Sequence, residues 1–392
     1  MNSFTTHERA ALSEMGRYTV HRATIEEFQK SRIPWSSLVS TMRFASPFCT
    51  WEWIYTWWEH FGAELELIPL FVHDGNELRG ILPLFRRRGS TAGHWLKGAM
   101  LDYCGATELY PDHLDIICAQ EDAPACTAAV LDFLTTRLPE WTWMRLPMLA
   151  EDSDLLRALP LSRGKLRVAV RHAAVAPYVA LVGSFEDYLV RLPKKDRYKI
   201  KSPRKKLLED GKLRYLAFEP AEFEMALRKL FELHAMRADV KGITSTFGRS
   251  AVFEFHRALL QRLNPNDVML RCLKDEAKII ATLYGFRCGS RIFFYQFGYD
   301  PEWSWASPGY VLVSEAIREA FTMGCTEYNF LQGDESYKHA FTREARALFD
   351  CYIYNATFSG RLARCAFELR ERLKATIRRG DEVRQPGPHG TF

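Results

Sequence analysis

The chain has 392 residues, a formal net charge of +5, 47% hydrophobic residues and 26% charged residues. These values exclude a disordered or collagen-like chain and predict a globular protein large enough for two domains. No run of 18 apolar residues occurs, so we expect no membrane-spanning helix. The first 16 residues lack a basic segment followed by an apolar one, and we therefore expect a cytoplasmic protein.

The first half of the chain alternates between helical and strand patterns. In order, we predict a strand at 17–25, a helix near 24–31, an aromatic helix at 46–62, a hairpin at 65–88, a strand at 113–119, a helix at 121–138 and a strand at 141–149. The hairpin prediction rests on Asp74-Gly75-Asn76, because glycine and asparagine tolerate the positive φ of a tight turn.

The second half repeats this order. We predict helices at 221–238 and 249–263, a hairpin at 267–288, a strand at 290–300, a helix at 308–323, a strand at 327–333, a short helix at 334–345 and a last strand at 348–355. Strands joined both by hairpins and by helices indicate a mixed sheet with helices on its faces. The sequence therefore predicts a duplicated α/β (α+β) unit.

The nine cysteines are scattered among apolar neighbours. None has the CxxC or CxxxH spacing that is typical of zinc sites. We expect reduced thiols in the core and no bound metal.

The segment "WASPGYVLVSEAI" (305–317) begins a predicted helix with a Pro-Gly pair. Pro308 suits the first helical turn, and Gly309 leaves the backbone open to close approach by another molecule. The amides of such a turn can hold an anion, typically a phosphate. The alternative is that Ser307 simply caps the helix.

The cluster "GDESYK" (333–338) is the richest in chemical groups. Asp334 and Glu335 stand at a predicted helix start, where one could serve as a base or both could serve as caps. Tyr337 and Lys338 would point about 100° apart on a helix, so both cannot face the same spot. Lys338 is the better candidate for binding or polarising an acyl carbonyl or an anionic group.

Further candidates lie on a helix and on a strand. His234 falls on the apolar stripe of the helix at 221–238, where it could be a base or a core residue. Arg237, one turn further on, could hold an acidic acceptor or form a surface ion pair. Tyr295 and Gln296 alternate along their strand, so one of them could face a substrate cleft. The loop residues 102–104 could line the acceptor cleft.

The run "KKDRYKIKSPRKK" (194–206) has eight cationic residues and one acidic residue. It could be a solvated helix face, or it could contact CoA phosphates, an anionic glycan or RNA. The tail also contains "RRGD" (378–381), a spacing seen where cyclic dinucleotides bind.

Three segments follow one another in the second half: "LHAMRADVKGITSTFG", "FFYQFGYDPEWSWASPGYVLVSEAI" and "GCTEYNFLQGDESYKHAF". In this order they resemble GNAT-type acyltransferases, in the FemAB-like branch associated with bacterial polysaccharide and cellulose biosynthesis. The resemblance implies two tandem GNAT-like units. We expect an N-terminal unit at 1–182, a C-terminal acyltransferase unit at 183–360, and a helix with a tail at 361–392. In the family, the pyrophosphate of acyl-CoA lies on the amides that begin the helix after the fourth strand, which here are those of Ser307, Pro308, Gly309 and Tyr310.

The expected function is acyl transfer from acetyl-CoA or another acyl-CoA to an amino sugar or a lipid-linked glycan intermediate of exopolysaccharide biosynthesis, alongside other proteins of that process. The expected catalytic residues are Lys338, Tyr337, Glu335, Asp334 and His234, and the expected substrate-binding residues are Arg237, Tyr295 and Gln296. Two alternatives stay open: a FemAB-type aminoacyl transferase, which would bind tRNA, and a module that binds without catalysis.

Overall fold

The computed structural model describes residues 17–87, 99–138, 140–161, 166–242 and 246–369. The elements of the first half are β1 (Tyr18–Arg22), α2 (Ile25–Lys30), α3 (Arg32–Thr41), α4 (Trp51–Phe61), β2 (Glu66–Asp74), β3 (Glu77–Arg87), β4 (Met100–Tyr103), β5 (Ile117–Cys118), α5 (Ala123–Thr136), β6 (Trp143–Ala150), α6 (Asp154–Ala158) and β7 (Arg167–Ala180). Those of the second half are α7 (Phe185–Arg191), α8 (Lys194–Arg204), β8 (Arg214–Ala217), α9 (Phe223–Lys241), α10 (Ser250–Arg262), β9 (Val268–Lys274), β10 (Ile279–Cys288), β11 (Arg291–Tyr299), α11 (Pro308–Thr322), β12 (Glu327–Asn329) and β13 (Ala345–Tyr354).

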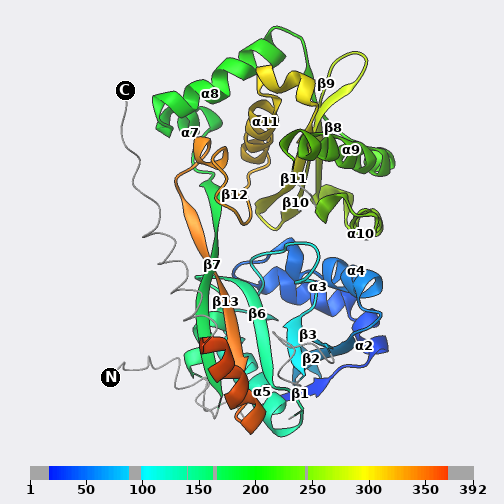
Figure 1. Cartoon of the computed structure of the whole chain (residues 1–392), viewed down its shortest axis with the longest axis vertical. Coiled ribbons are helices and arrows are strands. Elements are labelled where there is room, and N and C mark those ends of the chain that lie inside the picture. Colours follow the sequence, from blue (N-terminus) through cyan, green and yellow to red (C-terminus); the bar gives the residue numbers. More distant parts are fainter. Residues whose placement is uncertain (1–16, 88–98, 139, 162–165, 243–245, 370–392) are drawn as a thin grey trace.

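The strands of the described residues form one mixed sheet that runs the length of the molecule (Figure 1). Its order is β1-β2-β3-β4-β6-β13-β7-β12-β11-β10-β9-β8, with β5 paired to β3. Each half contributes a hairpin, a third antiparallel strand, a helix and then a parallel strand. The predicted fold class, a mixed α/β sheet flanked by helices, is confirmed.

The two halves exchange strands at the centre of the sheet. β13, at the end of the second half, lies between β6 and β7 of the first half, antiparallel to both. β7 is long enough to pair with β13 along 167–177 and then with β12 along 178–180. The strands on either side of the predicted boundary at 182 therefore interlock in space.

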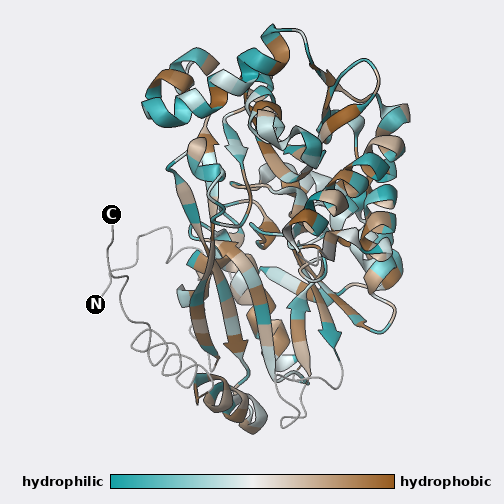
Figure 2. Ribbon diagram, turned by 45° about the horizontal axis from the view of Figure 1, so that its top comes forward, coloured by the Kyte–Doolittle hydropathy of each residue, from teal (hydrophilic) through white to brown (hydrophobic). Residues whose placement is uncertain are grey.

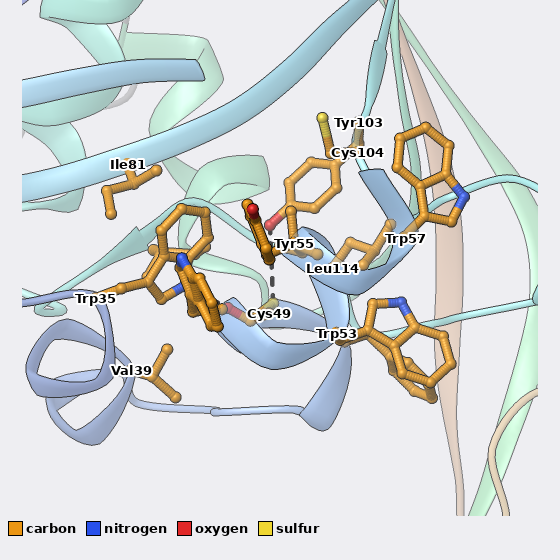
Figure 3. Close-up of a cluster of buried hydrophobic side chains, with 14 of the residues drawn as sticks. Trp35, Val39, Cys49, Trp53, Tyr55, Trp57, Ile81, Tyr103, Cys104 and Leu114 are labelled. Atoms are coloured by element: carbon orange, nitrogen blue, oxygen red, sulfur yellow. Dashed lines mark hydrogen bonds between the residues drawn. The ribbon is translucent and has the colours of Figure 1, made fainter. Parts of the chain in front are cut away.

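A shared aromatic core holds the halves together. Trp35, Trp53 and Trp57 are fully buried around α4 in the first half (Figure 3). The ring of Trp53 also meets Phe255 of α10 edge to face, with 5.0 Å between centroids. Aromatic pairs of this geometry add about 0.5–1.5 kcal/mol beyond the burial of their area, so α4 and α10 form a fixed contact between the halves.

The buried apolar residues of the second half belong to two clusters, and the strands of the sheet are predominantly apolar (Figure 2). α9 and α10 cover one face, and α11, supported by α7 and α8, covers the other. The site described below lies at the edge where these layers meet the first half.

Several local predictions are corrected by the structure. The predicted helix at 334–345 is wrong: its only helical part is a 3-10 turn at Lys338–Ala340, and β13 begins at Ala345. The predicted strand at 113–119 shrinks to β5, and α4 begins after the Thr50 cap because residues 47–49 form a 3-10 turn. The sequence analysis missed α3, β4, α6, β7, α7, α8 and β8. The "RRGD" motif lies outside the described residues.

Candidate functional site

A cavity opens where two parallel strands separate. β11 and β12 pair only from Arg291–Glu327 to Phe293–Asn329, after which β11 continues along β10 alone. The register of β10 with β11 shifts between Tyr284 and Gly285, so that Tyr295 is an extra residue on β11. Such a bulge bends its strand and increases its twist. The two strands therefore diverge after their third pair.

The cavity between the diverging strands has a volume of about 290 Å³. Its walls come from three places: the first-half loop at 108–110, residues 294–296 of β11, and the segment from Phe330 to Lys338 that follows β12. Phe247 and Val252 close it on the side of α10. Five predicted site residues meet here, namely Tyr295, Gln296, Glu335, Tyr337 and Lys338.

Lys338 organises one wall of the cavity. Its buried Nζ donates to the carbonyl oxygens of Leu331 (3.3 Å), Gln332 (2.8 Å) and Gly333 (3.3 Å), and it lies 2.9 Å from Glu335 Oε2. Burial lowers the pKa of this ammonium, against the opposing effect of Glu335. A lysine has three protons to donate, and the three carbonyls and the carboxylate account for all of them. In this structure Lys338 positions the wall.

The two acidic neighbours have different surroundings. Glu335 lines the cavity beside Lys338, and its side chain is 57% exposed. Gly333 makes room for it, because a Cβ there would lie 2.5 Å from Glu335 Oε2. Asp334 is not among the cavity residues and pairs with exposed His339 at 2.8 Å. Of these two carboxylates, Glu335 is therefore the one placed to accept a proton from a group in the cavity.

Tyr337 presents a protonated phenol to the same cavity. Its ring packs against Phe297 with 5.6 Å between centroids. Burial raises the pKa of Tyr337 above its usual value, and nearby Glu335 adds to this effect. The group therefore keeps its proton at neutral pH and can act as a hydrogen-bond donor at the cavity.

Tyr295 and Gln296 both line the cavity, because the bulge at Tyr295 interrupts the strict alternation that was predicted. The Tyr295 hydroxyl donates to Leu109 O (2.8 Å), which ties β11 to the first half. The Gln296 Oε1 accepts the Phe297 amide at 3.0 Å. That bond leaves the NH₂ group of Gln296 as a donor at the cavity.

The first-half loop at 108–113 was not foreseen as part of the site. Asp112 accepts the Gln332 amide, and the Gln332 Nε2 donates to Tyr110 O at 2.9 Å. Glu108, Tyr110 and His113 all have φ above +50°. Non-glycine residues adopt this conformation at a cost that surrounding contacts must offset, and such residues cluster at functional sites. The strained loop closes the cavity from the side of the first half.

The start of α11 lies one aromatic ring away from the cavity. Gly309 packs on Phe297, where a Cβ would lie 3.0 Å from the ring, and Tyr310 stacks on Phe341 at 5.7 Å. Ser307 has φ +53° and makes no side-chain cap, so the capping alternative is wrong. The Tyr310 amide donates to Ser307 O (3.1 Å). Within the described part of the chain, the Gly309 amide has no hydrogen-bond partner.

His234 and Arg237 flank this region without lining the cavity. The ring of His234 contacts Phe247 at 5.2 Å, and burial, followed by the charge of Arg237, lowers its pKa. Arg237 lies over the rings of Phe297 (4.6 Å) and Tyr299 (5.4 Å). Both side chains thus contact the aromatic layer between the cavity and α11.

The proposed acceptor loop at 102–104 belongs to the core of the first half, which corrects that expectation. Asp102 is fully buried and forms an ion pair with Arg145 at 2.6 Å. Tyr103 donates to Asp115 O (2.8 Å), and Cys104 is buried. All nine cysteines are free thiols, and only Cys365 is exposed.

Residues 194–339 match the family model described as an acetyltransferase (GNAT) domain. No curated protein matches the chain. Among solved structures, the crystal structure of FemX superimposes with a TM-score of 0.58 at 10% identity, covering 86% of this chain and 97% of that one. The C-terminal domain of a putative lysylphosphatidylglycerol synthetase from Agrobacterium fabrum gives 0.52 at 10% identity, covering 83% and 92%.

A conserved protein of unknown function from Bacteroides thetaiotaomicron gives a TM-score of 0.51 at 11% identity, covering 86% of this chain and 99% of that one. At these identities the likeness concerns the fold alone. The second half of this chain thus has the fold of GNAT acyltransferases. Among the described residues, no helix combines the length and apolar composition that a bilayer crossing requires.

Proposed function

We propose that the protein is an acyltransferase that takes the acyl group of an acyl-CoA thioester in the cavity between β11 and β12. The single observation that carries this proposal is the juxtaposition of that cavity with the start of α11. The Gly309 amide is unpartnered among the described residues, and no acidic residue stands in the first turn of α11. A helix start of this kind fits the diphosphate of the donor, and Ser307 and Tyr310 flank it.

The cavity residues would divide the chemistry among them. Glu335 takes a proton from the acceptor nitrogen or oxygen as that atom attacks the thioester carbonyl. The NH₂ group of Gln296 donates to the carbonyl oxygen as negative charge develops there. When the carbon–sulfur bond breaks, the Tyr337 hydroxyl donates a hydrogen bond to the departing thiolate, and the thiolate takes the proton that Glu335 received from the acceptor. Lys338 holds the wall that carries Glu335, and it is a positioning residue in this scheme.

The acceptor that we propose is an amino sugar or a glycan intermediate. Glu108, Gln332 and Glu335 form a polar rim, and Phe247, Phe294 and Phe330 give apolar surface beneath it. Sugar rings are bound by such pairings of hydrogen-bonding groups with flat apolar faces. Exopolysaccharide biosynthesis is the process in which we place this acceptor, on the family resemblance noted above.

The test is direct assay of the purified protein with a panel of CoA thioesters and amino-sugar nucleotides. Free thiol release and product mass should both rise with one donor and one acceptor. The matched control for a substitution of Glu335 is Asp334→Asn, which removes a neighbouring carboxylate that lies outside the cavity.

A tRNA-dependent aminoacyl transferase is the second candidate, favoured by the basic segment at 194–206. Transfer from aminoacyl-tRNA, without thiol release from any CoA thioester, would replace the first proposal with this one. Thermal shift with acetyl-CoA separates the two independently of turnover, because a bound donor stabilises the folded state. If no donor binds, the third candidate, a non-catalytic module, stands.

A further inference from the structure

A strongly basic surface surrounds α8. Residues 191–214 contain eleven cationic and three acidic residues, a local net charge of +8, while the rest of the chain sums to −3. α7 and α8 lie at one end of the molecule, opposite the end formed by α5 and β1 (Figure 1). The positive charge of the protein is therefore concentrated on one end.

Buried acidic groups fix α8 in place and leave the lysines outside. Asp196 is buried and pairs with Arg343 at 2.6 Å, and Arg204 pairs with the buried Glu315 of α11 at 2.6 Å. Among the described residues, six lysines of this surface have no ion-pair partner: Lys194, Lys195, Lys201, Lys205, Lys206 and Lys212. These six lysines define the basic face.

Exposed apolar side chains stand beside the basic face. Val182, Val190 and Tyr198 are 65%, 67% and 70% exposed. Arg191 donates to the carbonyl oxygen of Val182 at 3.0 Å, and Arg197 donates to that of Val190 at 3.5 Å. Cationic residues and exposed apolar residues thus lie next to each other at this end of the molecule.

We propose that this end of the protein docks on an anionic phospholipid bilayer. Lysines near a negatively charged membrane surface each add about 1 kcal/mol of attraction, and exposed aliphatic side chains gain by entering the interfacial region. Single-stranded RNA is the poorer fit, because its bases stack on aromatic rings and this surface offers Tyr198 alone among aliphatic neighbours. The proposal does not depend on the acyl transfer proposed above.

The test is sedimentation of the purified protein with vesicles of phosphatidylcholine alone and with equimolar phosphatidylcholine and phosphatidylglycerol. We expect binding only to the anionic vesicles, and release as salt is added. The variant Lys194→Gln/Lys195→Gln/Lys201→Gln should bind about a hundredfold more weakly, since each lysine contributes about fivefold. Equal sedimentation of the variant and the parent, or no sedimentation with anionic vesicles, would overturn the proposal.

A control variant removes the same charge elsewhere. Lys30→Gln/Arg228→Gln/Arg257→Gln neutralises exposed cations on α2, α9 and α10 and should bind as the parent does. Val190→Ser keeps every charge and should weaken vesicle binding severalfold, because it removes aliphatic contact. If Val190→Ser has no effect while tRNA displaces the protein from vesicles and binds more tightly, the surface is a nucleic-acid site and the lipid proposal fails.

Discussion

Two pairs of parallel strands among the described residues diverge after a short pairing, and one of them, β11 with β12, borders the cavity described above. β4 and β6 pair over three residues, from Met100–Trp143 to Asp102–Arg145, just as β11 and β12 do. In the first half the chain turns back into the gap: β5 pairs with β3, and the Leu114 amide donates to Met148 O at 3.3 Å. In the second half β11 runs on along β10, and the gap stays open.

The two helices that begin beside these gaps, α5 and α11, also differ, in the charge at their first turns. α5 follows Glu121 and Asp122, and Asp122 accepts a hydrogen bond from Tyr18 at 2.8 Å. α11 follows Ser307, with no acidic residue in its first turn. A carboxylate at the α5 start would repel a phosphate, whereas the α11 start attracts one. The same topology thus forms a filled structural unit and an open one, and function belongs to the site rather than to the fold.

The largest expected effect is on catalysis in the open gap. Glu335→Gln should lower the rate of acyl transfer by about 10²–10⁴-fold, the usual contribution of a positioned acid or base. Its unfolding free energy should fall by no more than about 1 kcal/mol, because the pair with Lys338 is half exposed on the Glu335 side. Steady-state kinetics and urea titration measure both quantities. A rate within threefold of the parent, on the order of 0.6 kcal/mol, would remove Glu335 from the mechanism.

A mutation in the filled gap between β4 and β6 should lower the free energy of unfolding and leave catalysis unchanged. Leu114 is 1% exposed, so Leu114→Ala should destabilise the protein by about 2–5 kcal/mol through lost burial and a cavity. The transfer rate per folded molecule should stay unchanged. Urea unfolding with activity measured on the folded fraction checks this. A stable Leu114→Ala protein with lost activity would place chemistry in the first half.

The helix starts can be made alike by one substitution. Ser307→Asp gives α11 an acidic start similar to that of α5, and aspartate tolerates the positive φ of this position. The carboxylate should stabilise the helix by about 0.3–1 kcal/mol. It should also raise the KM for the acyl-CoA donor about tenfold, on the order of 1.4 kcal/mol of lost diphosphate binding. A misfolded variant would lose both stability and donor affinity, whereas Ser307→Asp should gain stability and lose donor affinity. Ser307→Asn serves as the uncharged control.

The effect that is smallest at neutral pH is an acid sensitivity at the contact between the halves. His256 is fully buried, and burial lowers its pKa to about 3 from an ordinary value of 6.5. The unfolded chain therefore binds more protons than the folded one between pH 6.5 and pH 3. Stability should fall as the pH drops through this window, by up to about 1.4 kcal/mol per pH unit.

Urea titrations at several pH values, repeated with His256→Gln, test this prediction. In His256→Gln the unfolding free energy should depend less steeply on pH between pH 6.5 and pH 3. The control His172→Gln, at an exposed position, should show the same pH dependence as the parent. An unchanged slope in His256→Gln would assign the acid sensitivity to other groups.

Local chemistry in the sequence was enough to predict part of this architecture. The turn at Asp74-Gly75-Asn76, the helix from Pro308 to Thr322 and the hairpin of β9 with β10 follow from turn residues and periodicity. The exchange of β13 into the first half could not be predicted, because strand pairing across about 200 residues leaves no local pattern.

Several residues that line the candidate cavity were singled out from the sequence, but their local backbone structure was not predicted correctly. The cluster from Gly333 to Lys338 was identified, but the helix assigned to it fails because Lys338 binds the carbonyls of 331–333 and Gly333 adopts φ +116°. The loop at 108–113 escaped notice because its positive φ values fall on residues other than glycine. Sequence patterns carry no mark of such strain.

A crystal structure of the protein with bound acyl-CoA tests the central claim most directly. The account predicts the donor diphosphate at hydrogen-bond distance from the Gly309 amide and the thioester between Gln296 and Tyr337. A donor bound away from α11, or a Gly309 amide bonded within the protein while the donor lies elsewhere, would contradict it.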